Sequence, residues 1–203
     1  ADKIERPKKK RYESKPYTPK ELEELFRVVK GTEFELGVIL AAFYGLRRGE
    51  VVGLRWDAVD FERKTFSIRH TVIQTSIDGK CKTIAKDSPK TKSSFRSLPI
   101  VAPFEELLLR IKTKQEQNRK LCGKCYCNDY RDYIYVNDLG ERIKPAHLTQ
   151  GFPEFLENHG MRRIRFHDLR HSCATLLYAS GVALKDIQEW LGHSDISTTS
   201  NIY

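Results

Sequence analysis

The last 37 residues, from His167 to Tyr203, constrain the fold of this chain more than any other stretch; they read HDLRHSCATLLYASGVALKDIQEWLGHSDISTTSNIY. Apolar residues recur there at helical spacing, and each of the two runs is followed by a glycine. This pattern predicts one helix from 167 to 180 and a second from 184 to 191. Arg170 follows His167 by three residues, so we expect both side chains on the same side of the first turn.

The same stretch holds residue types that can bind and attack a phosphate. Arg170 offers a planar fork of donors that matches phosphate oxygens. His167 and His193 can donate hydrogen bonds or carry protons near neutral pH. Tyr203 can act as a nucleophile if its proton is removed and the charge on the attacked phosphate is stabilised. Each feature alone also has an ordinary explanation, as a solvated helix face, a helix C-cap or a chain end.

A second motif, AAFYGLRRGEVVGLRW, occupies residues 41–56. Its Gly-Leu-Arg-Arg-Gly-Glu and Gly-Leu-Arg-Trp, followed much later by His-Asp-Leu-Arg-His, Leu-Gly-His-Ser and a tyrosine, resemble the catalytic domain of tyrosine recombinases. Within that group the chain is most similar to the integrases of temperate phages and conjugative transposons. The resemblance covers roughly residues 16–203. It implies the DNA breaking-rejoining catalytic fold, which is mainly α with a small antiparallel β-sheet.

Helix signals recur along the chain before the last motif. Thr18, Pro19 and Glu21 form a capping box that predicts a helix ending near Gly31. A second helix is expected over 33–44, with Leu36, Ile39, Leu40 and Phe43 buried. Further helices are expected over 49–54, 103–120 and 145–159.

The hydrophobic period changes to two after Trp56, which predicts strands. Residues 65–73 alternate and are rich in β-branched and aromatic side chains. Asp78-Gly79 is a hairpin turn signal, and 81–84 and 94–100 supply further strands. We therefore expect one antiparallel sheet of about three strands, with another short strand over 133–136.

Composition and cysteine usage narrow the setting. The 36 Lys+Arg and 27 Asp+Glu residues give a net charge of +9, which fits a polyanionic partner. No apolar run approaches the ~18 residues that span a bilayer, and no signal peptide opens the chain, so no membrane partner is expected. Five cysteines, three of them at 122, 125 and 127, do not form a disulfide framework. A fourth ligand at zinc-finger spacing does not follow, so free thiols without a metal in a reducing cytoplasm are expected.

The resemblance implies a catalytic role for six residues. Two arginines would clamp the scissile phosphate, a lysine would protonate the leaving 5′ oxygen, two histidines would assist, and the tyrosine would form a 3′-phosphotyrosyl link; in chain order these are Arg47, Lys90, His167, Arg170, His193 and Tyr203. Lys92 is the rival of Lys90 for the lysine role. Glu50 matches an acidic residue that supports the site by pairing with a basic group. Two arginines can do what Mg²⁺ does in other phosphoryl transfers, so neither a metal nor another cofactor is expected.

The remaining basic residues point to DNA. Residues 1–16 are expected to be a basic linker and 17–203 the catalytic domain of a longer protein, whose N-terminal DNA-binding domains and C-terminal tail lie outside this chain. Contacts to phosphates are expected from Lys8, Lys9, Lys10, Arg48, Lys86 and Lys92.

The resemblance implies a site-specific recombinase in a bacterial host. It would act as a homotetramer on two double-stranded DNA attachment sites, with accessory excision or DNA-bending proteins as further partners. Two alternatives remain open from the sequence. The first is a type IB topoisomerase that relaxes supercoils, and the second is a non-catalytic DNA-binding regulator.

Overall fold

Helix α1 (Pro19–Val29) begins where the sequence predicts. The Thr18 hydroxyl accepts the Glu21 backbone N–H, and the Glu21 carboxylate accepts the Thr18 backbone N–H at 2.8 Å, which completes the capping box. The structure, a computed structural model, describes residues 15–87 and 95–192. Several predicted residues lie outside these ranges, namely Lys8, Lys9, Lys10, Lys90, Lys92, His193 and Tyr203.

The predicted helix over 33–44 takes a different form. Helix α2 (Glu35–Val38) is short and continues as a π-helix, Ile39–Phe43, in which the Tyr44 N–H reaches back to the Ile39 carbonyl at 3.3 Å. The wider π turn changes which residues face inward. Leu36 and Leu40 are buried as predicted, but Ile39 is only partly buried, and the prediction that Phe43 is buried was wrong because its side chain is 41% exposed. Gly45 then turns the chain with φ +68° into helix α3 (Arg48–Gly53).

The prediction of a single three-stranded sheet was wrong, because the described residues form two sheets. Strands β1 (Val59–Asp60), β2 (Thr65–Ile68) and β5 (Arg96–Pro99) form the first, and β3 (Thr71–Ile77) and β4 (Lys80–Lys86) form a separate antiparallel hairpin. The expected strand over 65–73 divides at Arg69 and His70 because its two halves pair with different segments. Ile68 lies opposite Arg96, whereas Thr71 lies opposite Lys86. The Asp78-Gly79 turn joins β3 and β4 as predicted.

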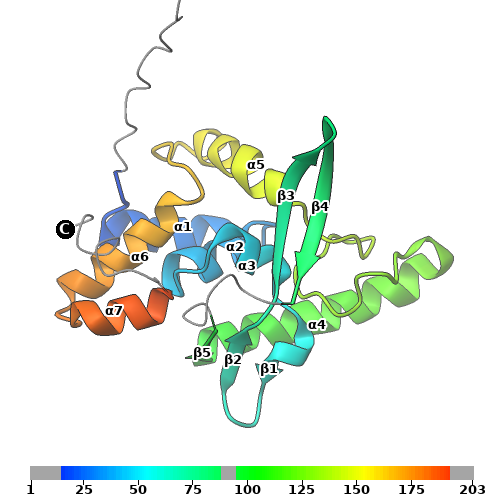
Figure 1. Ribbon diagram of the computed structural model, residues 1–203, viewed down its shortest axis with the longest axis horizontal. Coiled ribbons are helices and arrows are strands. Elements are labelled where there is room, and N and C mark those ends of the chain that lie inside the picture. The colour runs from blue at the N-terminus through cyan, green and yellow to red at the C-terminus, as the bar shows by residue number, and fades with distance from the viewer. Residues whose placement is uncertain (1–14, 88–94, 193–203) are drawn as a thin grey trace, which may run out of the picture.

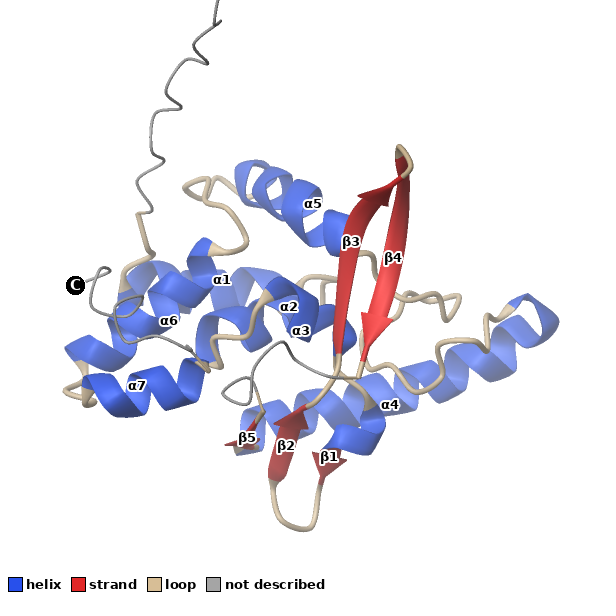
Figure 2. Ribbon diagram, in the orientation of Figure 1, coloured by secondary structure: helices blue, strands red, loops and turns tan. Residues whose placement is uncertain are grey.

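The β3–β4 hairpin stands out from the helices and passes beside α5 (Figure 2). It also packs closely on α3, where a Cβ at Gly49 would lie 2.9 Å from the Val72 carbonyl and one at Gly53 would lie 2.8 Å from the His70 carbonyl. Glycine at these two positions therefore allows helix and strand backbones to touch.

A short 3₁₀ helix, Trp56–Ala58, precedes β1, and two longer helices flank the sheets: α4 (Ala102–Cys122) and α5 (Pro145–Asn158). A second 3₁₀ helix, Gly123–Cys125, follows α4. The expected strand over 133–136 is reduced to two isolated bridges, Arg55 with Tyr133 and Val136 with Arg142, because no neighbouring strand extends the pairing in this described region. None of the helices in the described ranges is long and apolar enough to cross a lipid bilayer.

Helices α6 (Asp168–Ala179) and α7 (Leu184–Leu191) close the described chain and lie beside α1 and the α2–α3 segment (Figure 1). An aromatic cluster centred on Tyr44 packs α7 against β2 and α4. The Tyr44 ring lies 5.0 Å from Phe66 on β2, 4.9 Å from Phe104 on α4 and 6.2 Å from Trp190 on α7. Pairs at these separations add to the stability that their burial provides. The turn at Gly45 is thus held directly beside this core.

Replacing Gly45 tests that turn. A Cβ there would overlap Leu191 Cδ2 and approach Cys173 Sγ at 3.3 Å. We expect Gly45→Ala to lower the free energy of unfolding by about 1–3 kcal/mol more than Gly181→Ala, because packing an extra group into a filled core costs that amount. Gly181 is a matched control, since it has φ +81° with nothing within 4 Å of the added Cβ. Urea unfolding of both variants measures the difference, and equal losses would contradict this account of the turn.

Candidate functional site

Two of the predicted arginines meet at the C-terminus of α7. Arg47, between Gly45 and α3, donates from Nη2 to the Gly192 carbonyl at 2.6 Å. Arg170, on α6, donates from Nη2 to the adjacent Leu191 carbonyl at 2.8 Å and from Nη1 to the Gly45 carbonyl. The carbonyls at a helix C-terminus carry partial negative charge and attract cations. Segments far apart in the sequence therefore place two guanidinium groups side by side.

The two arginines differ in exposure. Arg170 is 3% exposed, whereas the Arg47 side chain is 38% exposed. Burial, and then the charge of Arg47, lower the pKa of the Arg170 guanidinium to about 9. The group still carries its positive charge at neutral pH. Arg170 is therefore a rigid, desolvated cation, while Arg47 presents its charge to solvent and to any anion that binds there.

A buried carboxylate supports Arg47. Glu50, 2% exposed, accepts the Arg47 backbone N–H at 3.0 Å and its Nη1 at 2.8 Å. The same carboxylate accepts a hydrogen bond from Arg96 Nη2 at 2.9 Å. Burial alone would raise the pKa of the Glu50 carboxyl, but Arg96 and Arg47 outweigh burial and lower it. The structure thus pairs Glu50 with basic groups, as the sequence predicted.

The sequence prediction missed Arg96, although a signal for it existed. On β5 Arg96 shares a face with Leu98, which is buried, and the Arg96 side chain is only 7% exposed. An arginine on the inward face of a strand requires a buried carboxylate. Glu50 meets that requirement, so Arg96 fixes the distance between β5 and α3 behind Arg47.

His167 lies at the N-cap of α6 and keeps its ring in contact with solvent. The ring lies edge-on to His171, with the centroids 5.1 Å apart. The protein atoms around the ring, and then His171 and Arg170, lower the pKa of His167 to about 4. At neutral pH His167 is therefore a neutral imidazole, which can both donate and accept a hydrogen bond.

Two other residues predicted to bind DNA, Arg48 and Lys86, lie within the described ranges. Arg48 turns toward α5 and donates to the Thr149 hydroxyl. Lys86 is exposed at the end of β4, with its Cα opposite Thr71. Both residues stay predictions as DNA contacts.

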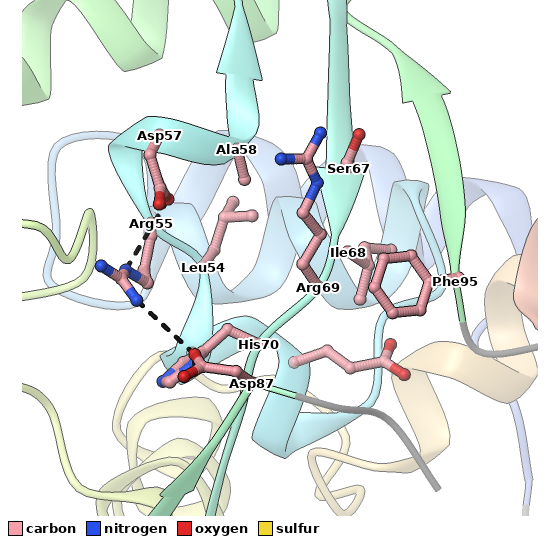
Figure 3. Close-up of a pocket in the computed structure, with 12 residues that line it drawn as sticks. Leu54, Arg55, Asp57, Ala58, Ser67, Ile68, Arg69, His70, Asp87 and Phe95 are labelled. Carbon is pink, nitrogen blue, oxygen red and sulfur yellow. Dashed lines mark hydrogen bonds and ion pairs between the residues drawn. The ribbon is translucent and has the colours of Figure 1, made fainter. Parts of the chain in front are cut away.

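A cavity of about 290 Å³, lined on one side by Glu50, opens toward the base of the β3–β4 hairpin (Figure 3). Asp87, one of the residues that line it, lies 2.6 Å from His70 Nδ1 and 3.6 Å from Arg55 Nη1. His70 Nε2 in turn contacts the Tyr133 hydroxyl at 2.8 Å. Asp87 is the last described residue before 95, so these contacts fix the strand end from which the segment with Lys90 and Lys92 departs.

Potential metal-ligating side chains are not clustered in the part of the chain that the structure describes. There, no group of three or more His, Cys, Asp or Glu side chains is arranged to hold a metal ion. The thiols of Cys122, Cys125, Cys127 and Cys173 are free.

Comparison with known proteins places this geometry in context. The sequence profile described as the phage integrase family matches residues 17–203. A tyrosine recombinase XerC-like protein of Caldanaerobacter subterraneus is 34% identical over 197 residues, covering 94% of this chain and 50% of that protein. The ICEBs1 integrase of Bacillus subtilis is 27% identical over 204 residues, covering 100% of this chain and 53% of that protein. The chain thus spans about half the length of these relatives.

Solved structures share the fold. The Tn1549 transposon integrase in complex with transposon right end DNA superposes with a TM-score of 0.76 at 21% identity, covering 95% of this chain and 62% of that one. The crystal structure of XerA recombinase gives a TM-score of 0.68 at 19% identity, covering 97% and 61%. The predicted fold class, mainly α with a small antiparallel sheet, is confirmed.

Replacing Glu50 tests the electrostatic support of Arg47. Glu50→Gln removes the charge that faces Arg96, and breaking a buried ion pair from one side costs about 3–5 kcal/mol. We expect a loss of about 3 kcal/mol in the free energy of unfolding, measured by urea titration. Glu62→Gln, at an exposed position, should change it by less than about 0.5 kcal/mol. Similar small changes in both variants would contradict a buried, charged Glu50.

The depressed pKa of His167 predicts a pH dependence. Between the ordinary value of 6.5 and about 4, the unfolded chain binds a proton at this position and the folded chain does not. The stability that depends on neutral His167 is therefore complete above pH 6.5 and is lost as the pH falls toward 4. Urea unfolding from pH 7.5 to 4.5 should show a shallower decline for His167→Gln than for the unaltered protein. Identical declines would contradict the assignment.

Proposed function

Because the chain belongs to the phage integrase family of tyrosine recombinases, as its motifs predict, we propose that it cuts and rejoins DNA to integrate or excise a mobile element. The single observation that carries the proposal is the convergence of Arg47 and Arg170 at the C-terminus of α7. Two fixed guanidinium groups side by side provide donors for the non-bridging oxygens of one phosphodiester. A regulator that only binds DNA has no need for a desolvated arginine of this kind.

The reaction requires stabilisation of the pentacoordinate phosphorane. Arg47 and Arg170 would hold the two non-bridging oxygens and absorb the charge that develops as the tyrosine oxygen attacks. Their present acceptors, the carbonyls of Gly192, Leu191 and Gly45, orient the guanidinium groups before DNA arrives. Such preorganisation lowers the barrier because the site does not rearrange during the reaction.

The remaining roles fall to Tyr203, to two histidines and to a lysine. Tyr203 would attack and form the 3′-phosphotyrosyl link, leaving a free 5′ hydroxyl. His193, which follows Gly192 directly, would donate to the same phosphate. His167, neutral at pH 7, would serve as a hydrogen-bond partner and proton carrier. Lys90, or its rival Lys92, would protonate the leaving 5′ oxygen.

The phosphotyrosyl bond conserves the energy of the broken phosphodiester, so rejoining consumes no ATP. The arginine charges take the part that a metal takes in other phosphoryl transfers. We infer that 17–203 form the catalytic domain and that 1–16 are the basic linker before it. The net charge of +9 favours double-stranded DNA as the partner. Exchange between two duplexes calls for four protomers on two DNA sites in the bacterial cytoplasm, where accessory DNA-bending or excision proteins can act.

A nicked suicide substrate tests the proposal. Cleavage releases the short fragment that carries the free 5′ hydroxyl, and this fragment diffuses away. Rejoining is then impossible, so the protein stays covalently attached to the 3′ end of the labelled strand. We expect an adduct on a denaturing gel in the presence of EDTA, its loss in Tyr203→Phe, and at least a hundredfold slower formation in Arg170→Lys, because lysine lacks the bidentate fork. Tyr178→Phe, at an exposed tyrosine on α6, is the matched control and should form the adduct normally.

Absence of an adduct on DNA that the protein binds, in the full-length protein as well, would contradict the tyrosine mechanism. If the adduct forms, joining of two different labelled duplexes separates recombination from simple relaxation of supercoils. Relaxation without joining would contradict the recombinase assignment.

A further inference from the structure

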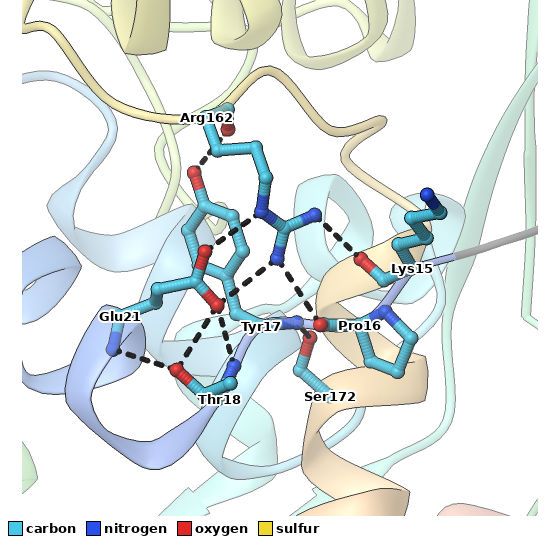
Figure 4. A network of polar contacts seen from close by, with 7 residues as sticks. All are labelled: Lys15, Pro16, Tyr17, Thr18, Glu21, Arg162 and Ser172. Carbon is cyan, nitrogen blue, oxygen red and sulfur yellow. Dashed lines mark hydrogen bonds and ion pairs between the residues drawn. The ribbon is translucent and has the colours of Figure 1, made fainter.

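The chain that leads into α1 is held against the loop before α6 by hydrogen bonds from one arginine, Arg162 (Figure 4). Arg162, in the loop before α6, donates from Nη1 to the Lys15 carbonyl at 3.0 Å and from Nη2 to the Pro16 carbonyl at 3.2 Å. Its Nε and Nη2 also bind the Glu21 carboxylate at 2.7 and 3.0 Å. Arg162 therefore uses every nitrogen of its guanidinium to hold a segment about 140 residues away.

Tyr17 completes the attachment. Its ring lies 4.8 Å from the Arg162 guanidinium carbon, and its hydroxyl donates to the Arg162 carbonyl. The residue is 2% exposed. Its backbone N–H donates to Ser172 Oγ on α6 at 2.8 Å, and the Ser172 hydroxyl donates to the Asp168 carbonyl at 3.0 Å. The segment before α1 is thus bonded directly to the first turns of α6.

These contacts and Arg170 lie on opposite sides of one helix. Asp168 and Ser172 are four residues apart and share a face. Arg170 lies between them, about 200° around the helix from each, since successive residues advance by about 100°. From that side it reaches the carbonyls of Gly45 and Leu191. A displacement of the Tyr17 side of α6 therefore moves Arg170.

We propose that Arg162 and Tyr17 form a clamp that positions α6, and through it Arg170, in response to where the chain at Lys15 and Pro16 lies. The inference rests on the proposed function, in which Arg170 binds the scissile phosphate. Arg162 is then a positioning residue, because it acts on the phosphate through Arg170. Any force on the polypeptide before Lys15 is transmitted to the phosphate-binding arginine.

The geometry favours a positioning role over a purely stabilising one. The Arg162 side chain is 39% exposed and that of Glu21 is 31% exposed, and ion pairs with such exposure contribute little to stability. The planar fork nevertheless fixes direction, because four donations from one rigid group allow a single arrangement. Loss of Arg162 should therefore loosen α6 with only a small effect on unfolding.

Arg162→Ala tests the clamp, with Arg163→Ala as the matched control. Arg163 is the next residue in the same loop, is 64% exposed and pairs with Glu157 at 2.7 Å. At saturating suicide substrate we expect Arg162→Ala to form the covalent adduct about 10- to 100-fold more slowly, with DNA affinity changed less than about twofold, since small misplacements of a catalytic group have effects of this size. Arg163→Ala should match the unaltered protein in both.

Arg162→Lys separates charge from geometry. Lysine keeps the charge but loses the fork, so we expect it to resemble Arg162→Ala. Restoration of the normal rate by lysine would overturn the proposal, because it would show that charge alone suffices. A rate reduced only in proportion to the unfolded fraction, measured by thermal denaturation, would also overturn it.

Hydrogen exchange of the DNA-free protein provides a readout independent of cleavage. Amides of 169–174 should exchange faster in Arg162→Ala than in Arg163→Ala, and equal exchange would overturn the clamp even if no adduct forms. If the unaltered protein forms no adduct, the result contradicts the proposed function. If the unaltered protein forms the adduct, and Arg162→Ala and Arg163→Ala form it at equal rates, the result contradicts the clamp alone. The two failures are therefore distinguishable.

Discussion

The C-terminus of α7 is the constraint on which the rest of the site depends. Two adjacent carbonyls, those of Leu191 and Gly192, each accept a hydrogen bond from a different arginine. Gly192 has φ +68°, a conformation that ends the helix and that side chains rarely adopt. If α7 ended one residue earlier, these carbonyls would point elsewhere and Arg47 and Arg170 would lose their common anchor. The aromatic contact of Trp190 with Tyr44 holds α7 in this place against the core.

The charge balance of this region is unusual for a protein interior. Three guanidinium groups, those of Arg47, Arg96 and Arg170, surround one buried carboxylate, that of Glu50. Glu50 accepts hydrogen bonds both from Arg96, which is buried, and from Arg47, which is open to solvent, so its single negative charge is shared between them. Positive charge therefore remains uncompensated on the buried Arg170 and the solvent-exposed Arg47. Burying cations without full compensation is costly, and the cost is reduced when an anion such as a phosphodiester binds.

Local signals explain what the sequence could predict. The capping box at Thr18 and Glu21 and the Asp78-Gly79 turn depend on contacts within a few residues, and both are confirmed. The π turn before Gly45 was not predictable, because its wider hydrogen bonds depend on how Tyr44 packs against β2 and α4. The division of the sheet at His70 likewise depends on which segments pair, a long-range choice that alternation alone does not reveal.

The same distinction applies to the site. The family resemblance predicted phosphate-binding roles for Arg47 and Arg170. It did not predict that both side chains would meet at the end of α7, because that meeting involves residues 45, 47, 170, 191 and 192 at once. Arg162 gave no motif signal, since its partners, the carbonyls of Lys15 and Pro16, are main-chain atoms without a sequence signature. Arg96 could have been found from the alternation on β5. Main-chain partners are thus the part of this site hardest to predict.

Arg170 and His167 differ in charge at neutral pH because their surroundings shift their pKa values differently. The pKa of Arg170 stays near 9 even when buried, so its charge persists across the physiological range. His167, beside the same cations, is held neutral because the protein atoms around its ring and the positive neighbours oppose its protonation. An arriving phosphodiester would reverse part of that effect, since its negative charge favours the imidazolium. Binding of DNA would then bring the pKa of His167 closer to neutrality, where a proton can be both taken up and released.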